Sequence, residues 1–365
     1  MISPGSLKII RTAMLACAAV ANAQTSDAAP VNGPSPGSHV TPLGSIPACA
    51  AFNGLPQKGA KGDQVRVPAG SFVMGSDDAY PEEAPARRMK LAGFLIDRHD
   101  VTNAEFGGFV AATGYRTLAE RGLDPARYPQ LPAAMTKPGS TVFLPPKDLL
   151  GGAMQWWRFI PGADWRHPTG PGSSVELLGN HPVVQIAYED ALAYARWLGR
   201  DLPTEAEFEY AARGGTTTTY PWGDTFEIRS KLMANTWQGA FPFQNKGADG
   251  FVATSPVGCF PANGYGLYDM VGNVWQWVRD PWQQTPAQQA SSAPPNPDVD
   301  IEDALVAKAR APALGTIKGG SFLCSPIYCK RYRPSARHAQ DLTMGTNHIG
   351  FRTVLRLPVT GRRDP

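Results

Sequence analysis

The sequence predicts an α+β fold that is rich in irregular structure. Glycine and proline are abundant, with 38 and 35 of the 365 residues, and this favours turns over long regular elements. Two capping-box patterns, each followed by a glycine, predict short helices. Short segments of alternating apolar and small residues are typical of strands. Together these three observations indicate a turn-rich globular protein in which helices are few.

The first 23 residues have the features of a secretory signal peptide. Lys8 and Arg11 precede a short apolar stretch, and the sequence ANA at 21–23 is typical of a cleavage site. Cys17 raises lipidation as an alternative, although the residues before it form a poor lipobox. The apolar run is too short to span a bilayer, and no later stretch is long enough. We therefore expect an exported protein, periplasmic or secreted, without membrane insertion.

Residues 24–62 are rich in proline, glycine, serine and alanine, and we interpret them as a linker or extended arm. The domain proper is expected at 63–358. Its first elements are a strand followed by a turn between Val65 and Ser76, and a second strand from Leu91 to Asp97.

Three helices are expected after these strands. Thr102-Asn103-Ala104-Glu105 is a capping box that begins one helix, which Gly114 ends. Apolar positions at helical spacing from Tyr188 to Leu198 predict a second. A further capping box at Thr204-Glu205-Ala206-Glu207 begins the third, which Gly214 ends.

Two stretches lack such patterns. Residues 118–179 are irregular and aromatic, with Trp156, Trp157 and Trp165, and a long loop-rich stretch inside a domain is more often functional than idle. Residues 281–312, rich in proline and glutamine, are predicted to be a surface insertion or mobile loop.

Composition and missing motifs exclude several functions. The chain has 34 Lys and Arg against 31 Asp and Glu, and no long basic run, so nucleic-acid binding driven by phosphate neutralisation is unsupported. No HExxH, GxxxxGK[ST], GxGxxG or GxSxG pattern occurs. This argues against a zincin, a P-loop or Rossmann nucleotide site and a GxSxG hydrolase.

The most informative cysteines are Cys324 and Cys329, five residues apart and followed by Lys330, Arg331 and Arg333. One interpretation is a small-loop disulfide, which an oxidising compartment favours. The other is a reactive pair, because nearby positive charge lowers the pKa of a thiol. Two thiolates without imidazole or carboxylate partners suit a soft ion, Cu(I) above all.

Other residues suggest structural roles. Cys49 and Cys259 are candidates for a disulfide. The four cysteines that follow the predicted signal peptide allow three connectivities, so their pairing stays open. Asn235 and Asp249 lie in a turn-rich segment whose oxygens suit Ca²⁺. Asn and Asp are also ordinary turn residues, which is the simpler explanation for both.

Several longer strings resemble the formylglycine-generating enzyme, or sulfatase-modifying factor, family. The resemblance runs from about Val65 to Arg356 and is carried by the following strings: VPAGSFVMGS, FLIDRHDVTNAEF, DWRHPTGP, HPVVQIAYEDALAYARWLGRDLPTEAEFEYAARGG, NGYGLYDMVGNVWQW, GGSFLCSPIYCKRYRPSAR and HIGFR. Some of these strings are shared with sulfoxide synthases and non-catalytic relatives. The cysteine pair is the feature that indicates the oxidase.

The resemblance implies a duplicated, irregular, C-type-lectin-like fold and an oxidase that acts on a protein. Family members use O2 to convert the cysteine of a CxPxR motif in sulfatases to Cα-formylglycine. By resemblance, Cys324 and Cys329 hold Cu(I), and the substrate thiol joins as a third sulfur ligand. Export then implies a sulfatase polypeptide that is still unfolded when the two proteins meet.

The resemblance also implies roles for individual residues. Ser321 matches the small residue near the oxygen pocket of the family, and Trp275 the tryptophan packed over it. The expected lining of the peptide cleft is Tyr328, Arg337 and His348, with Asn347 adjacent. The first calcium site would use Asn235, Thr236, Asp249 and Phe251, and the second Asp269, Gly272, Val274 and Gln276.

Three departures from the family pattern affect these expectations. Gln276 stands where glutamate is usual, which removes a negative charge from the second calcium site. His348 replaces a common asparagine, and Pro334 occupies a position where some relatives have a disulfide cysteine. Two alternatives stay open: an exported lectin-like binding module with a Cys324–Cys329 disulfide, and a family relative that oxidises another substrate.

Overall fold

The computed structural model describes residues 63–129, 131–148, 153–284 and 313–357. Its central element is a four-stranded sheet in the order β11-β10-β9-β12. Strand β12 runs parallel to β9, and the other pairs are antiparallel. The strands are β9 (Trp275–Pro281), β10 (Leu314–Lys318), β11 (Arg337–Asp341) and β12 (Ile349–Phe351).

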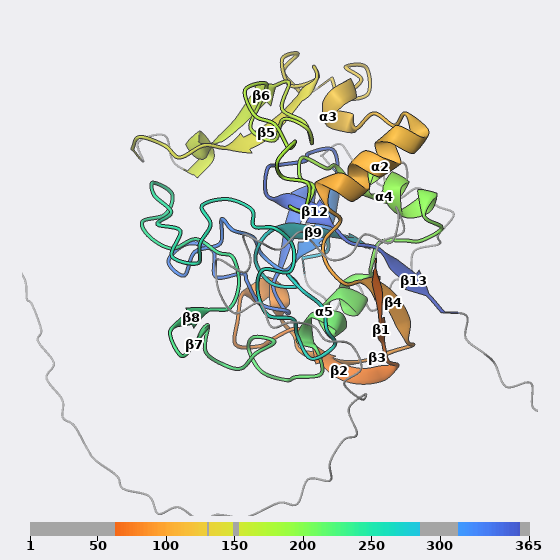
Figure 1. The fold of residues 1–365 in the computed structure, drawn as a ribbon, viewed down its shortest axis with the longest axis vertical. Coiled ribbons are helices and arrows are strands. Elements are labelled where there is room, and N and C mark those ends of the chain that lie inside the picture. Colours follow the sequence, from red (N-terminus) through yellow and green to blue (C-terminus); the bar gives the residue numbers. More distant parts are fainter. Residues whose placement is uncertain (1–62, 130, 149–152, 285–312, 358–365) are drawn as a thin grey trace, which may run out of the picture. The chain divides into compact units, whose positions relative to one another are not determined.

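The helices are α2 (Asn103–Thr113), α3 (Leu118–Arg121), α4 (Tyr188–Trp197) and α5 (Glu205–Arg213). Helix α5 lies on one face of this sheet and α2 and α4 on the other (Figure 1), whereas α3 packs beside residues 139–143. The capping boxes at Thr102 and Thr204 are both formed, and Gly114 and Gly214 end their helices in the left-handed conformation. These predictions are confirmed, as is the predicted helix from Tyr188. Helix α3 was not predicted.

A second sheet has the order β1-β4-β13, formed by β1 (Gln64–Val67), β4 (Phe94–Asp97) and β13 (Val354–Arg356). The predicted strand at 65–76 is divided, because the chain turns at Pro68 and continues as β2 (Gly70–Met74), which pairs with β3 (Arg87–Leu91). The strand predicted at 91–97 is likewise interrupted at Gly93. A Cβ at Gly93 would lie 3.2 Å from the carbonyl oxygen of Val67, so glycine allows this approach without a shift of the neighbouring backbone.

The stretch predicted to be irregular contains a hairpin of β5 (Gly139–Phe143) and β6 (Trp157–Pro161). A long connection joins the two strands, so the sequence carries no tight-turn signal there. The hairpin is fixed to the segment before β12: Ser140 Oγ donates to Gly345 O at 2.8 Å, and the Phe143 amide donates to Asn347 Oδ1 at 3.0 Å. The remaining short elements are η2 (Pro81–Glu83), η3 (Ala153–Trp156), β7 (Glu227–Ile228) and β8 (Lys231–Leu232).

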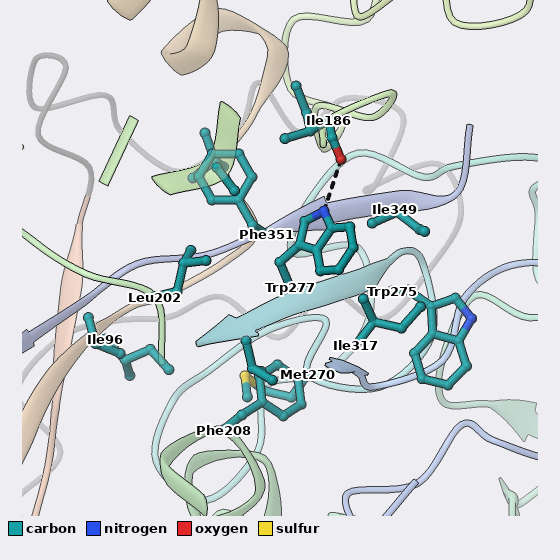
Figure 2. Packing of buried hydrophobic residues seen from close by; sticks show 14 of the residues in the cluster. Ile96, Ile186, Leu202, Phe208, Met270, Trp275, Trp277, Ile317, Ile349 and Phe351 are labelled. Atoms are coloured by element: carbon teal, nitrogen blue, oxygen red, sulfur yellow. Dashed lines mark hydrogen bonds between the residues drawn. The ribbon is translucent and has the colours of Figure 1, made fainter. Parts of the chain in front are cut away.

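The hydrophobic core is built around β9. Trp277 is fully buried, and its indole Nε1 donates to the carbonyl of Ile186 at 2.9 Å, as Figure 2 shows. Phe208 of α5 packs from the other side of the strand (Figure 2). The fold class predicted from the sequence is therefore confirmed as a mixed α+β architecture with few helices and much irregular chain.

Charged groups are also buried between α5 and the sheet. The Lys318 ammonium lies 3.2 Å from Glu209 Oε2 and 3.5 Å from Glu205 Oε1. Glu209 also accepts from the Gly75 amide and from Arg213, both at 2.8 Å. A buried cation without such partners is strongly destabilising, so these carboxylates are needed wherever Lys318 and Arg213 are present.

Several sequence predictions fall outside the described residues: the signal peptide at 1–23, the arm at 24–62, Cys49, and nearly all of the insertion at 281–312. Strand β9 ends at Pro281, where that insertion was predicted to begin. Among the described residues, none of the helices is both long and apolar enough to cross a bilayer.

Replacing Glu209 by alanine should lower the free energy of unfolding by about 3–5 kcal/mol, because Lys318 and Arg213 lose a shared buried partner. Urea unfolding followed by circular dichroism measures the change. Glu176→Ala, at an exposed position, is the matched control and should change it by less than about 0.5 kcal/mol. Equal effects of the two substitutions would contradict the role assigned to the buried charges.

Candidate active site

Two free cysteines face each other after β10. The Sγ atoms of Cys324 and Cys329 are 3.1 Å apart, and neither residue is in a disulfide. Two turns bring them together: the Cys324 amide donates to Ser321 O at 2.9 Å, and the Cys329 amide to Ser325 O at 3.0 Å. The sequence predicted the pair, and of its two interpretations the structure has the unbridged one.

The pair opens onto a cleft of about 1410 Å³, part of which is open to solvent. Most of the lining is aromatic or apolar, as is usual for binding sites. The lining residues are Met135, Thr141, Trp156, Trp157, Phe159, Phe241, Trp275, Ile317, Ser321, Leu323, Cys324, Tyr328, Cys329, Arg331, His338, Gln340, Met344, Thr346 and His348.

Four residues predicted at the site besides the cysteines line this cleft. Ser321 is fully buried, and its Oγ accepts from the Leu323 amide at 3.2 Å. Trp275 is also buried. Tyr328 is half exposed and stacks on Phe241, with ring centroids 4.5 Å apart.

The fourth is His348, whose ring lies 4.9 Å from the ring of Trp157. Burial lowers the pKa of His348 to about 3. The imidazole is therefore neutral at physiological pH, and its Nδ1 is hydrogen-bonded with Thr346 Oγ1.

The structure does not bring Arg337 and Asn347 into the cleft. Arg337 is buried elsewhere and makes a bidentate ion pair with Glu205, at 2.6 and 3.0 Å. Asn347 holds the β5–β6 hairpin through the Phe143 amide. Because Glu205 is 132 residues from Arg337, no local pattern indicated that this arginine already had a partner.

The cation beside the sulfurs is Arg331. Its Nε donates to Glu82 Oε1 at 3.0 Å, and its guanidinium lies 3.9 Å from the centroid of the Tyr80 ring. Arg333 is instead paired with Glu83, and Lys330 is exposed. Of the three cations predicted to act on the thiols, Arg331 is thus the one that lines the cleft.

The two thiols have different acidities. A hydrogen bond from Cys324, together with the charge of Arg331, lowers the pKa of Cys329 to about 7 even though burial opposes ionisation. Burial raises the pKa of Cys324 well above its usual value, and the hydrogen bond that it donates to Cys329 adds to the shift. Near pH 7 Cys329 is therefore about half ionised, whereas Cys324 remains protonated.

Sequence reasoning missed several cleft residues, including Phe241, His338, Gln340, Met135 and Met344. None belongs to a recognisable motif, so only the packing of distant segments reveals them. The aromatic stretch with Trp156, Trp157 and Trp165 was predicted to be functional. Trp156 and Trp157 line the cleft, whereas Trp165 packs in the hydrophobic core against Phe106.

At the first predicted calcium site one side-chain oxygen accepts no hydrogen bond from the described residues, while both carboxylate oxygens of Asp249 accept them. Asn235 Oδ1 is buried and has no hydrogen-bond partner among the described residues. Asp249 is buried, which raises its pKa, and its Oδ2 accepts from the Thr236 amide at 2.9 Å. The carbonyl of Thr236 and Asp249 Oδ2 both contact one amide nitrogen, that of Gln238. Oxygens that converge in this way fit a hard cation. Phe251, the fourth predicted ligand, is joined to the same carboxylate, because its amide donates to Asp249 Oδ1 at 3.0 Å.

The second predicted site does not fit a cation. Gln276 Oε1 accepts from Arg352 Nε at 2.6 Å, and Gln276 Nε2 donates to the carbonyl of Asp269 at 2.9 Å. Arg352 is fully buried and also contacts Asp100 at 3.0 Å. The amide is thus committed at both ends, and a guanidinium supplies the positive charge beside Asp269. Gly272 and Val274, the other predicted ligands, lie in the turn that leads into β9.

Comparison with known proteins identifies the family. Residues 51–357 match the family model of the sulfatase-modifying factor enzyme 1-like domain. The chain is 53% identical to the formylglycine-generating enzyme of Mycobacterium tuberculosis, over 81% of this chain and 98% of that protein. The chain belongs to the formylglycine-generating enzyme family. It is therefore an enzyme, and the resemblance stated from the sequence is confirmed.

Two further relatives agree with this assignment. The formylglycine-generating enzyme of Thermomonospora curvata is 44% identical, over 81% of this chain and 94% of that protein. Among solved structures, PvdO from Pseudomonas aeruginosa has a TM-score of 0.55 and 27% identity, and the match covers 81% of this chain and 95% of that one. The fold of the family is thus shown, while its duplicated lectin-like origin stays a prediction.

In the metal-free protein, iodoacetamide should alkylate Cys329 much faster than Cys324. The rate should rise with pH to a half-maximum near pH 7, because the pKa of Cys329 is about 7 and the thiolate, which is the nucleophile, is lost as pH falls. Arg331→Met should move the midpoint to higher pH, whereas Arg331→Lys should move it less. Peptide mapping by mass spectrometry reads out both sites, and preferential labelling of Cys324 would refute the assignment.

Proposed function

We propose that this enzyme converts the cysteine of a CxPxR motif in sulfatases to Cα-formylglycine, with O2 as oxidant and copper as cofactor. The observation that carries the proposal is the unbridged pair Cys324 and Cys329, 3.1 Å apart at the wall of a large cleft. Its relatives, which are formylglycine-generating enzymes, indicate the class of reaction. The free thiols argue against the alternative of a binding module that contains a Cys324–Cys329 disulfide.

The donor set suits Cu(I). Among the described residues, no group of three or more His, Cys, Asp or Glu side chains is placed to hold a metal, so the pair offers two sulfurs and no harder ligand. Soft thiolates of this kind select monovalent copper. When bound by Cys324 and Cys329, copper would supply the one-electron chemistry that lets O2 react with a thiol-bearing substrate.

The residues around the pair set the charge of Cys329 and shape the cleft for a polypeptide. Arg331 favours the deprotonated form of Cys329 by lowering its pKa, so a ligand sulfur is available at neutral pH. Tyr328 and Phe241 give the cleft a stacked aromatic wall that can hold an extended polypeptide. Ser321 and Trp275 limit the space beside the sulfurs. The neutral His348 lies beside Trp157 and adds no charge to the cleft.

The polypeptide must reach the cleft before the sulfatase folds, because its cysteine has to enter in an extended segment. An exported enzyme, periplasmic or secreted, would accordingly act on sulfatases that are themselves exported unfolded. The partners of the reaction are then this unfolded chain and O2.

Calcium is proposed as a structural cofactor at the first site only. Asn235 and Asp249 would bind through side-chain oxygens, and Thr236 and Phe251 through carbonyls. At the second site, Gln276 is occupied by Arg352, so no calcium is proposed there.

A CxPxR peptide incubated with the copper-loaded enzyme and O2 should lose the mass difference between a thiol and an aldehyde. Cys324→Ser and Cys329→Ser should each reduce turnover on the order of 10³-fold or more, because the two sulfurs act as one unit. Mass spectrometry of the peptide measures this. Ser71→Ala, at an exposed position outside the cleft, is the control and should leave turnover unchanged. Full turnover by either cysteine variant would contradict the proposed function.

Calcium should stabilise the protein with a stoichiometry of one ion per chain. At a free concentration 100 times the dissociation constant, the gain in unfolding free energy should be roughly 2.7 kcal/mol. Asp249→Asn should abolish the gain, and Asp78→Asn, at an exposed position, should preserve it. Isothermal titration calorimetry and thermal unfolding test this, and two bound ions would contradict the proposal for the second site.

A further inference from the structure

A second hollow adjoins the catalytic cleft, and we call it the side chamber. It measures about 550 Å³, part of it open to solvent. Four residues line both the side chamber and the cleft: Met135, Thr141, Phe159 and Met344. The two spaces are therefore neighbours that share a wall, and a group bound in the cleft lies next to the chamber.

The rest of the chamber wall is mixed: apolar residues and glycines predominate, and Lys137 and Asp341 also line it. Leu118 comes from α3, and Leu123 and Leu131 from the loop that follows it. The ends of this loop meet, since the Leu123 amide donates to the carbonyl of Thr136 at 2.8 Å. Strands β5 and β6 supply the opposite side. The apolar side of the wall, formed by these leucines, favours contact with an apolar guest.

One polar group in the chamber has no partner among the described residues. Gln185 is fully buried, and its Oε1 accepts no hydrogen bond from them, although its Nε2 donates to Pro168 O at 2.6 Å. A buried acceptor left unsatisfied costs about 1–3 kcal/mol. The residue also has a φ of 61°, which is uncommon for a side-chain-bearing residue. Backbone strain of this kind clusters at functional sites.

The backbone of Gln185 is held by close packing. A Cβ added at Gly345 would lie 2.5 Å from the carbonyl carbon of Gln185, so only glycine fits beneath it. The segment around Gly345 is the same one that binds the hairpin through Ser140. The chamber is thus built by contacts among distant segments, and its acceptor is fixed in place.

We propose that the side chamber binds a bulky apolar side chain of the substrate polypeptide, from a residue that flanks the reacting cysteine. The inference rests on the proposed function. In an extended chain, neighbouring side chains point to opposite sides, so a segment in the cleft can direct one of them across the shared wall. Met135 and Met344 are flexible and adapt to guests of different shape.

The test compares CxPxR peptides in which each flanking position in turn is Ala, Leu or Phe. The wild-type enzyme should prefer Leu or Phe over Ala at one position, by about tenfold in kcat/KM. Leu123→Trp fills the chamber and should remove this preference. The matched control Leu177→Trp, at a position that is 97% exposed, should retain the preference.

The outcomes separate this inference from the proposed function. If the copper-loaded wild-type enzyme turns over none of the peptides, the proposed function itself is contradicted. Turnover without a preference at any flanking position, or a preference that survives in Leu123→Trp, would overturn the side chamber alone. If Leu123→Trp slows all peptides equally, circular dichroism shows whether the variant is folded. A folded variant with a uniform loss of turnover also overturns the proposal. If Leu123→Trp is unfolded, Leu131→Trp is tested in its place.

Discussion

The approach of two sulfur atoms is the constraint on which the site depends. It requires the chain to leave β10 sharply, which Gly319 and Gly320 allow with φ values of 92° and 77°. A Cβ at Gly320 would lie 2.6 Å from the carbonyl oxygen of Arg331. The segment after the cysteines therefore packs directly on the glycines before them, and the loop that carries both thiols is closed on itself.

This closed loop places its two thiols in different environments, and their acidities differ as a result. Cys324 is almost fully buried, whereas Cys329 is partly exposed. Burial alone would raise the pKa of both thiols. For Cys329 this effect is outweighed by the hydrogen bond that it accepts from Cys324 and by the charge of Arg331, so its pKa is lowered. Cys324 is thus the hydrogen-bond donor of the pair, and Cys329 is the thiol that ionises first as pH rises.

Sequence alone predicted the parts of the fold that local chemistry determines. The helices at Thr102 and Thr204 follow from side chains three residues apart and a glycine at the end, and the cysteine pair from spacing and nearby charge. The β5–β6 hairpin was not predictable, because its connection is long and its partners, such as Gly345, are distant. The same limit applies to Arg337, whose pairing with Glu205 no local pattern reveals, and to the side chamber, which separate segments of the chain enclose.

The ion pairs that hold the cysteine loop also join opposite ends of the domain. Glu82 contacts Arg331 across 249 positions of the sequence, and Glu83 contacts Arg333 across 250. Contacts of such range form only after nearly the whole domain has been synthesised. A partly synthesised chain either lacks the two cysteines or carries them without these ion pairs. The active site is therefore completed late in synthesis, as a single unit.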